Sequence, residues 1–311
     1  MIDFVKLNGL GNDFVFIDDL DRSLDLTDDQ VKWLCDRHFG IGADGVILVR
    51  PPKHSGSIAY MHYINSDGSL AQMCGNGVRC FAKYLVDRGL VPDNVESFTV
   101  DTLAGPRVIT YEVDEQGLLS TATVDMGTPI LEPEEIPVDA PFDSVSADGT
   151  DYVGNLELES PWGTFRFTCV SMGNPHAVTF LQDTESMDPA LFSSTEKSLD
   201  TLDIDKVGAF FESHPAFPEK ANIEFASVQD DGIHMRVFER GCGETLACGT
   251  GACATSVAAA LQGLGDRDNR LVLRGGELLI SWKSDNHVFM TGKAEESFTG
   301  TVDLKRAVDH L

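Results

Sequence analysis

An internal repeat is the feature that most constrains how this chain can fold. Residues 59–80 and 233–254 align without a gap at a constant offset of 174 residues. The alignment superimposes Cys74 on Cys248, and each cysteine opens the element Cys-Gly-x-Gly after an apolar run and a polar turn. Solenoid repeats recur every 20–50 residues or so, and these two copies lie much farther apart. The repeat therefore predicts a duplicated domain, with two similar halves facing each other across a cleft.

A weaker echo of the same duplication lies upstream of each copy. Gly-Asn occurs at residues 11–12 and again at residues 173–174, and each pair is followed by a short apolar run. The total length of 311 residues also exceeds the usual size of one domain, which is about 100–200 residues. We therefore expect two domains of similar architecture.

The segments that follow the two Cys-Gly-x-Gly elements predict helices. Residues 78–89 carry apolar side chains at helical spacing and end at a glycine, which is a common helix stop. Residues 252–263 are apolar or small on nearly all sides. A helix without a polar face must be buried all round, so we expect a central helix wrapped by strands. A third, short helix is predicted over residues 33–40.

Most of the remaining chain reads as β-strands separated by Gly, Pro, Asn and Asp, which gives a mixed α/β (α+β) fold class. The expected strands are 13–19, 44–50, 57–64, 97–102, 107–113, 120–126, 164–170, 176–181, 233–239, 270–275, 277–282 and 287–292. The proline-rich acidic tract 132–161 and the segment 183–205 are expected to be extended loops or crossovers.

The charge balance excludes some partners. The net charge is −27, with thirteen acidic and no basic residues between 108 and 165. Such a chain repels phosphate backbones, so we expect neither nucleic acid nor an anionic membrane as a partner. The acidic stretch is best explained as a solvated face. Neither a signal peptide nor an apolar stretch of the ~20 residues needed to span a membrane is visible, which favours the cytoplasm.

The seven cysteines are expected to be free thiols. They stand at positions 35, 74, 80, 169, 242, 248 and 253, with irregular spacing and no C-x-x-C. An odd number without a secretion signal disfavours a disulfide framework, and no histidine lies at zinc-site spacing. The sequence therefore predicts neither a metal site nor a cofactor.

Two of these thiols, Cys74 and Cys248, are candidates for reactive groups. A helix N-terminus carries unpaired N–H donors and partial positive charge, which favour a bound carboxylate and lower the pKa of a cysteine placed there. A lone cysteine at a helix start is more often a small buried residue. Its duplication favours the reactive interpretation. We expect Cys35, Cys80, Cys169 and Cys253 to lie in the core, and we assign Cys242 no role.

Paired thiols suit the inversion of a carbon stereocentre. One acid/base group must remove a proton from one face of the carbon, and a second must deliver a proton to the opposite face. The helix N-termini could meanwhile hold an α-carboxylate and stabilise the developing charge. The sequence leaves open which thiol is the resting anion, because interacting sites titrate as a pair.

On these motifs the chain resembles the diaminopimelate epimerase family along nearly its whole length. The matching segments are KLNGLGNDFVFID (6–18), RHFGIGADGVILV (37–49), INSDGSLAQMCGNGVRC (64–80), SMGNPHAV (171–178), ANIEFASV (221–228) and RVFERGCGETLACGTGACA (236–254). The resemblance implies interconversion of LL- and meso-diaminopimelate, a step toward lysine and peptidoglycan, without a cofactor. It also implies two pseudo-symmetric domains, each a mixed β-barrel around a central helix, in a homodimer.

The resemblance further implies domain limits and residue roles. The first domain would comprise residues 1–121 with a returning strand in 293–311, and the second residues 122–292. Cys74 and Cys248 match the catalytic thiols, and His176 and Glu239 the pair that tunes them. The substrate-binding set would be Asn12, Asn65, Gly75, Asn76, Asn174, Asn222, Glu239, Arg240, Gly249 and Thr250. Some relatives carry Gln where this chain has Gly45, so a contact through that side chain is absent here.

Other interpretations stay open at this point. The fold could serve a racemase acting on another amino acid such as histidine, a non-catalytic amino-acid-binding protein or a thiol redox protein. The asparagines Asn12, Asn65 and Asn222 could form turns. His176 could be a structural histidine, and Glu239 with Arg240 an ordinary surface pair.

Overall fold

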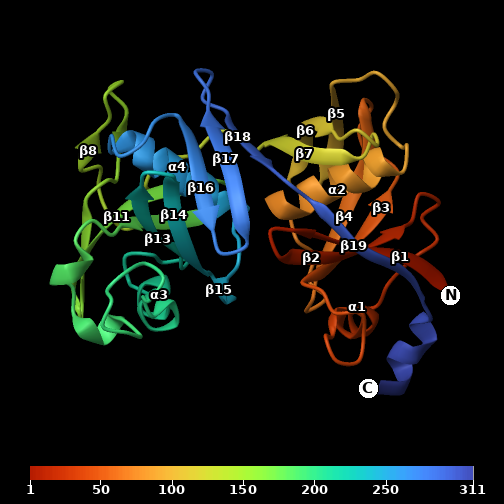
Figure 1. The fold of residues 1–311 in the computed structure, drawn as a ribbon, viewed down its shortest axis with the longest axis horizontal. Coiled ribbons are helices and arrows are strands. Elements are labelled where there is room, and N and C mark those ends of the chain that lie inside the picture. The colour runs from red at the N-terminus through yellow and green to blue at the C-terminus, as the bar shows by residue number, and fades with distance from the viewer. Residues whose placement is uncertain (311) are drawn as a thin grey trace. The chain divides into compact units, whose positions relative to one another are not determined.

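The computed structural model describes residues 1–310 and divides into two compact units (Figure 1). Unit 1 comprises Met1–Asp125 with Thr291–Leu311, and unit 2 comprises Met126–Met290. Each unit holds two α-helices and a mixed set of parallel and antiparallel strands.

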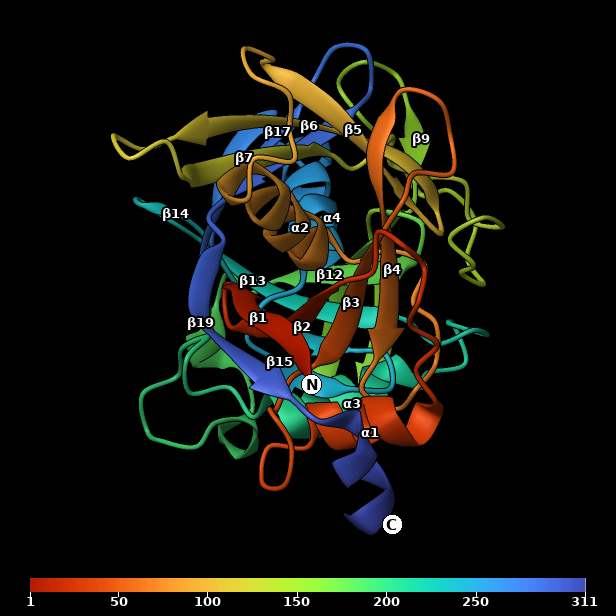
Figure 2. The same cartoon turned by 90° about the vertical axis from the view of Figure 1, so that its right-hand side faces the viewer.

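Unit 1 is built from consecutive strands with one helix in each of two crossovers. Its elements are β1 (Ile2–Gly9), β2 (Asn12–Asp18), α1 (Asp28–Cys35), β3 (Gly45–Arg50), β4 (Ser57–Asn65), α2 (Gly75–Asp87), β5 (Ser97–Thr102), β6 (Gly105–Val113), β7 (Leu119–Asp125), β19 (Glu295–Val302) and η3 (Leu304–His310). β2 pairs with β3 in parallel and β4 with β5 in parallel, whereas β1–β2, β3–β4, β5–β6 and β6–β7 are antiparallel. The C-terminal strand β19 lies antiparallel beside β1 (Figure 2).

Unit 2 repeats this order of pairings. Its elements are β8 (Ser144–Val145), β9 (Asp151–Tyr152), β10 (Leu156–Ser160), β11 (Gly163–Ser171), β12 (Pro175–Phe180), η1 (Thr184–Ser186), η2 (Pro189–Leu191), α3 (Ile204–Glu212), β13 (Asn222–Gln229), β14 (Gly232–Glu239), β15 (Gly243–Thr245), α4 (Gly249–Leu261), β16 (Asp268–Leu273), β17 (Gly276–Trp282) and β18 (Val288–Gly292), whose last two residues belong to unit 1. β12–β13 and β14–β16 are parallel, and β11–β12, β13–β14 and β16–β17 are antiparallel. The duplication predicted from the sequence is confirmed.

In unit 1 the strand β2 packs against the central helix α2 on one face and against a cluster that includes α1 on the other. Phe14 and Phe16 face the central helix α2, where the Phe16 ring stacks on Phe81 at 6.4 Å between centroids. The alternate residues Val15 and Ile17 join the cluster on the other side, which includes side chains of α1. All four side chains are buried, as expected for a strand covered on both faces.

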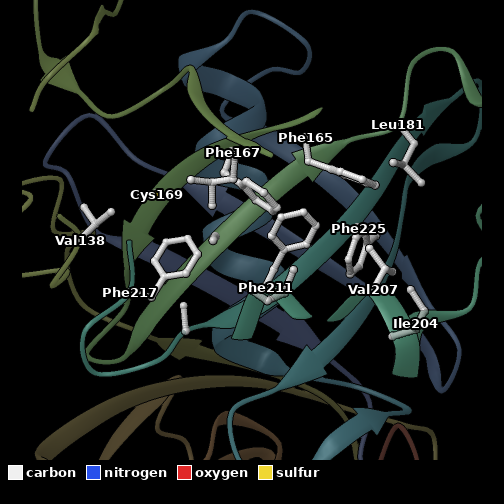
Figure 3. Close-up of a cluster of buried hydrophobic side chains, with 14 of the residues drawn as sticks. Val138, Phe165, Phe167, Cys169, Leu181, Ile204, Val207, Phe211, Phe217 and Phe225 are labelled. Atoms are coloured by element: carbon white, nitrogen blue, oxygen red, sulfur yellow. The ribbon is translucent and has the colours of Figure 1, made fainter. Parts of the chain in front are cut away.

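Unit 2 has the same two-sided arrangement. Phe211 of α3 packs against Phe165 and Phe167 of β11, with ring centroids 5.0 and 4.9 Å apart (Figure 3). The helix α4 contacts β11, β12, β13, β14, β16 and β17. All of its residues except Thr250 and Ala260 are buried, which confirms the prediction of a central helix wrapped by strands.

Some of the expected elements need correction. The short helix is not at 33–40 but at Asp28–Cys35, because a capping box between Thr27 and Gln30 starts it earlier and residues 37–39 form a turn. The acidic tract 132–161 is not only a loop, since it contributes β8, β9 and β10 and buries Ile136 and Val153. The segment 183–205 is mostly irregular, as expected, but its end begins α3, which the sequence pattern did not predict.

The twelve expected strands are present with ends shifted by at most two residues, and β1, β13 and β15 were missed along with the short strands of the acidic tract. Within residues 1–310, no helix is both long enough and apolar enough to cross a lipid bilayer.

Candidate active-site residues

The first candidate thiol caps the central helix of unit 1. Cys74 has extended backbone angles, φ −140° and ψ 118°, and its Sγ accepts a hydrogen bond from the Gly77 N–H at 3.4 Å. The thiol therefore occupies the place where a helix N-terminus offers unpaired donors. The backbone N–H groups beside it lie on the buried residues Gly75, Asn76 and Gly77.

Asn12 and Asn76 are held close to this thiol by a chain of hydrogen bonds. The Asn12 amide nitrogen donates to Asp44 at 2.6 Å, which fixes the orientation of the amide. Its carbonyl oxygen then faces the Cys74 Sγ at 3.4 Å and the Asn76 amide nitrogen at 3.3 Å. The Asn76 oxygen accepts from the buried Arg79 guanidinium at 2.9 Å. These predicted site residues therefore form one connected group in unit 1.

Asn65 lies at the end of β4, where it pairs with Gly45 of β3. Its amide nitrogen donates to the Ser69 hydroxyl at 3.0 Å, so its side chain stabilises the turn that follows β4. Gly45 has no room for a side chain on this backbone, because an added Cβ would lie 2.5 Å from the Tyr63 ring. A larger residue at this position would require the surroundings to shift.

The second candidate thiol, Cys248, caps the central helix of unit 2 in the same extended conformation, with φ −122° and ψ 112°. It is buried, and its Sγ lies 3.6 Å from the Thr250 hydroxyl. Burial raises the pKa of Cys248 well above its ordinary value, and the carboxylates of Glu239 and Glu224 raise it further. The expectation that the helix terminus lowers this pKa is wrong. Loss of hydration and two nearby carboxylates outweigh a helix end that carries about half a charge.

His176 lies fully buried on β12, between a carboxyl group and an amide. Its Nδ1 is 2.6 Å from Glu224 Oε1, and its Nε2 is 3.1 Å from Asn174 Oδ1. Both ring nitrogens therefore have partners, so the side chain has a defined orientation. His176 also pairs with Asn222 in the parallel ladder of β12 and β13.

Asn222, Glu239 and Arg240 meet at the ends of β13 and β14. The Asn222 amide donates to the Pro175 carbonyl oxygen at 2.8 Å and accepts from the Arg240 backbone N–H at 2.9 Å. Glu239 accepts from the Thr245 hydroxyl. The exposed Arg240 guanidinium donates to the Glu219 carbonyl oxygen at 3.0 Å, so its contact is not an ion pair with Glu239.

The sequence interpretation missed Asp44, Arg79 and Glu224. Asp44 accepts from Asn12, and Arg79 donates to Asn76, so both act on predicted site residues. Glu224 is the single charged side chain in the buried run 222–226, and that isolation is the signal that could have identified it. A charged group buried in an apolar strand requires an explanation, because its loss of hydration is costly.

Comparison with known proteins gives a consistent result. The model of the family described as "Diaminopimelate epimerase" matches residues 4–132 and 168–296, which contain Cys74 and Cys248 respectively. A diaminopimelate epimerase of Acetivibrio thermocellus is 42% identical over 303 residues, covering 97% of this chain and 98% of the relative. One of Nostoc punctiforme is 45% identical over 302 residues, covering 96% and 99%.

The fold is shared with more distant proteins. A solved structure described as a probable proline racemase from Agrobacterium radiobacter superimposes with a TM-score of 0.67 at 14% identity, covering 98% of this chain and 93% of the other. At this identity the likeness concerns the fold alone. The predicted fold class, two repeated halves of mixed strands with a central helix each, is confirmed.

Proposed function

Because the chain belongs to the diaminopimelate epimerase family, we propose that it interconverts LL- and meso-diaminopimelate. It is then an isomerase of lysine biosynthesis that inverts one α-carbon by proton transfer, without a metal or pyridoxal phosphate. The observation that carries the proposal is the duplicated cysteine that caps the central helix of each unit. A pure binding protein has no need of this duplicated thiol.

The proposed acid/base groups are Cys74 and Cys248. Inversion requires that a proton leaves one face of the α-carbon and that another arrives on the opposite face, which two separate groups accomplish. The raised pKa of Cys248 keeps it protonated at neutral pH. We therefore propose Cys248 as the proton donor of the resting enzyme, which leaves Cys74 as the proposed base for the first proton removal.

The helix N-termini supply the proposed site for the α-carboxylate. Gly75 and Asn76 begin α2, and Gly249 and Thr250 begin α4. Their backbone N–H groups can donate to a carboxylate and to the negative charge that develops when the α-carbon loses its proton. The two glycines among them carry no side chain that would stand between a ligand and the backbone.

The remaining site residues are proposed to recognise the distal end of the substrate. Asn12, Asn65, Asn174 and Asn222 offer both donors and acceptors, which suits a zwitterionic amino-acid group. Arg240 is exposed and can grip the distal carboxylate through two parallel hydrogen bonds. Glu239 can pair with the substrate ammonium, and His176 with Glu239 tunes the charge of the thiols.

The direct test is isotope exchange in D2O. With LL-diaminopimelate as substrate, dialysed protein should form meso-diaminopimelate that carries deuterium at the inverted α-carbon, without added cofactor. Absence of both exchange and product under reducing conditions would contradict the proposal. A parallel incubation with a chelator should leave the rate unchanged.

A substrate panel distinguishes this activity from that of a racemase with another substrate. Diaminopimelate should be preferred by a wide margin over histidine and lysine, since histidine lacks the distal amino-acid group and lysine lacks the distal carboxylate that Arg240 would bind. Equal rates with histidine would instead indicate the second candidate, a racemase of the same fold.

We also propose that the protein acts in the cytoplasm as a homodimer, and that its domains comprise residues 1–121 with 293–311 and residues 122–292. Light scattering after size-exclusion chromatography tests the dimer. Limited proteolysis, followed by mapping of the cleavage sites, tests the domain limits.

A further inference from the structure

Glu224 is a buried carboxyl group that the proposed mechanism does not use. It lies on β13 with no solvent exposure, two residues beyond Asn222 and on the same face of the strand. Asn222 pairs with His176, so Glu224 is diagonal to His176 on the face that meets α4. Its Oε1 lies 2.6 Å from the His176 Nδ1.

The start of α4 is shaped to admit this carboxyl group. A Cβ added to Gly251 would lie 2.7 Å from Glu224 Oε1 and 3.3 Å from the Cys248 Sγ. Any side chain at position 251 would therefore push the carboxyl oxygen away from His176. The second glycine of the Cys-Gly-x-Gly element in unit 2 provides the space that Glu224 occupies.

The matched positions in unit 1 show that the fold itself does not require a carboxyl group here. A Cβ added to Gly77 would meet Ile47 at 3.5 Å and Phe14 at 3.6 Å, which are ordinary contacts. Ile47 stands in β3 where Glu224 stands in β13, since Phe16 pairs with Ile47 as Val178 pairs with Glu224. At these matched positions unit 1 therefore has the apolar pair Phe14 and Ile47, whereas unit 2 has the imidazole of His176 and the carboxyl group of Glu224.

The carboxyl group is costly to keep in this place. Burial raises the pKa of Glu224 above its ordinary value, against the opposing influence of His176. Its second oxygen, Oε2, has no hydrogen-bond partner within residues 1–310. A buried polar group without full compensation lowers stability, so a function is the expected reason for its presence.

We propose that Glu224 is a positioning residue that holds the His176 ring through Nδ1 and thereby directs Nε2 toward Asn174. A carboxylate acceptor on Nδ1 keeps that nitrogen protonated and fixes the ring plane. The Nε2 then faces the Asn174 Oδ1 at 3.1 Å, a contact in which the ring nitrogen is the donor. Gly251 contributes to this arrangement because its lack of a side chain leaves room for Glu224.

This inference rests on the proposed function, which assigns His176 and Asn174 to the site. Glu224 acts on the reaction only through them, and it does not need to touch the substrate. Its loss is therefore expected to change kcat more than KM.

The test replaces Glu224 with the residue that fills the matched position of unit 1. Glu224→Ile removes the acceptor and should lower kcat by about 10²-fold, the loss expected when a site group is misplaced by about 1 Å, with KM nearly unchanged. Glu224→Gln keeps a carbonyl acceptor for Nδ1–H and should lose far less activity. The control Asp101→Asn also removes a fully buried carboxyl group, one that His54 and Ser57 contact, and should leave kcat unchanged.

The decisive measurement is the ¹⁵N spectrum of the His176 ring. In the wild-type protein and in Glu224→Gln, Nδ1 should carry the proton. In Glu224→Ile the proton should leave Nδ1 and the ring should carry its proton on Nε2, which faces the Asn174 Oδ1, and Gly251→Ala should reproduce that change. Combining Gly251→Ala with Glu224→Ile should cost little more than Glu224→Ile alone, because the displaced carboxyl group is already absent.

The inference is overturned if the His176 ring nitrogens and kcat are the same in Glu224→Ile as in the wild type. It is also overturned if Gly251→Ala leaves the ring unchanged. A wild-type protein without epimerase activity would contradict the proposed function instead, and the ¹⁵N spectra would still test the link between Glu224 and His176.

Discussion

The two units share a backbone plan but differ in the chemistry around the thiol. Strand register and the neighbours of Gly77 and Gly251 define the matched positions. The matched pairs are Cys74 and Cys248, Phe14 and His176, Gly45 and Asn222, Ile47 and Glu224, and Asn65 and Glu239. Around Cys74 these side chains are neutral, whereas around Cys248 they include two carboxyl groups and an imidazole.

In the proposed mechanism this difference gives the two thiols different roles. The thiol of Cys248 has a raised pKa because it is buried near Glu239 and Glu224. Cys74 is only half-buried, and its Sγ accepts the Gly77 N–H. A fold that holds a matched pair of thiols in unmatched surroundings can keep one protonated and leave the other to act as base.

The largest expected effect on activity comes from removing either thiol. Cys74→Ala and Cys248→Ala should each lower kcat/KM by at least about 10³-fold, within the range that a positioned acid or base contributes. The loss should be similar for both, because inversion needs both groups. The control Cys242→Ser changes an exposed cysteine and should retain activity. Substantial epimerase activity in either alanine variant would contradict the mechanism in which both thiols transfer protons.

The second prediction compares the matched glycines. Gly251→Ala should destabilise the protein by about 1–3 kcal/mol, because the new methyl group collides with Glu224 and the surroundings are overpacked. Gly77→Ala meets only ordinary contacts and should be neutral or stabilising by about 0.5–1 kcal/mol, the helix penalty of glycine. Urea unfolding of both variants measures the difference. Equal losses would mean that the two helix starts are packed alike.

The third prediction compares two buried carboxyl groups with opposite pKa shifts. Asp101 has a lowered pKa, with burial opposed by hydrogen bonds from His54, Ser57 and Lys53, so its stabilisation is present above its unfolded pKa and lost as the pH falls. Glu224 has a raised pKa through burial, so its contribution to stability is lost as the pH rises through the folded pKa.

At pH 7, Asp101→Asn should therefore lose about 1–3 kcal/mol. Glu224→Gln should gain about 1 kcal/mol, a rise in Tm of about 2–4 °C. Calorimetry at pH 7 and pH 4.5 checks both signs, since the gain from Glu224→Gln should shrink at the lower pH. A lower Tm for Glu224→Gln at pH 7 would mean that the carboxyl group is kept for stability.

The smallest expected effects concern the caps of the two outer helices. Thr27 accepts from the Gln30 N–H before α1, and Asp203 accepts from the Lys206 N–H before α3. Thr27→Ala and Asp203→Ala should each cost about 1 kcal/mol in unfolding free energy, with activity retained. A much larger loss of unfolding free energy at one of these positions would show that the two caps do not contribute equally to stability.

Patterns within one stretch of sequence predicted much of the molecule. The duplicated element predicted both central helices and both capping thiols, because Cys-Gly-x-Gly and the apolar helices are local features. The outer helices were harder to find. The capping box of Thr27 and Gln30 defines α1, yet the apolar residues nearby suggested a later start.

The acidic tract shows a different difficulty. In β10 the exposed Glu157 and Glu159 alternate with Leu156 and Leu158. This is the pattern of a half-buried strand, which the surrounding prolines and acids obscured.

The electrostatics of the site depended on contacts that are distant in sequence. Glu224 lies 48 residues from the His176 ring that it contacts. The raised pKa of Cys248 comes from burial and from carboxyl groups on β13 and β14. The helix start alone would lower the pKa of Cys248. The roles of all the site residues stay predictions, and the observed side-chain contacts of Asn65 and Arg240 are with Ser69 and with Glu219.

The central claim is that each inversion uses two different thiols, and the early course of the reaction in D2O tests it most directly. With LL-diaminopimelate as substrate, the meso product should carry deuterium at the inverted carbon from the first turnovers. The LL-diaminopimelate recovered at the same time should carry almost none, because the thiol that removes the proton is not the one that delivers the new one. Equal deuterium in recovered substrate and product would point to a single base and would contradict the account.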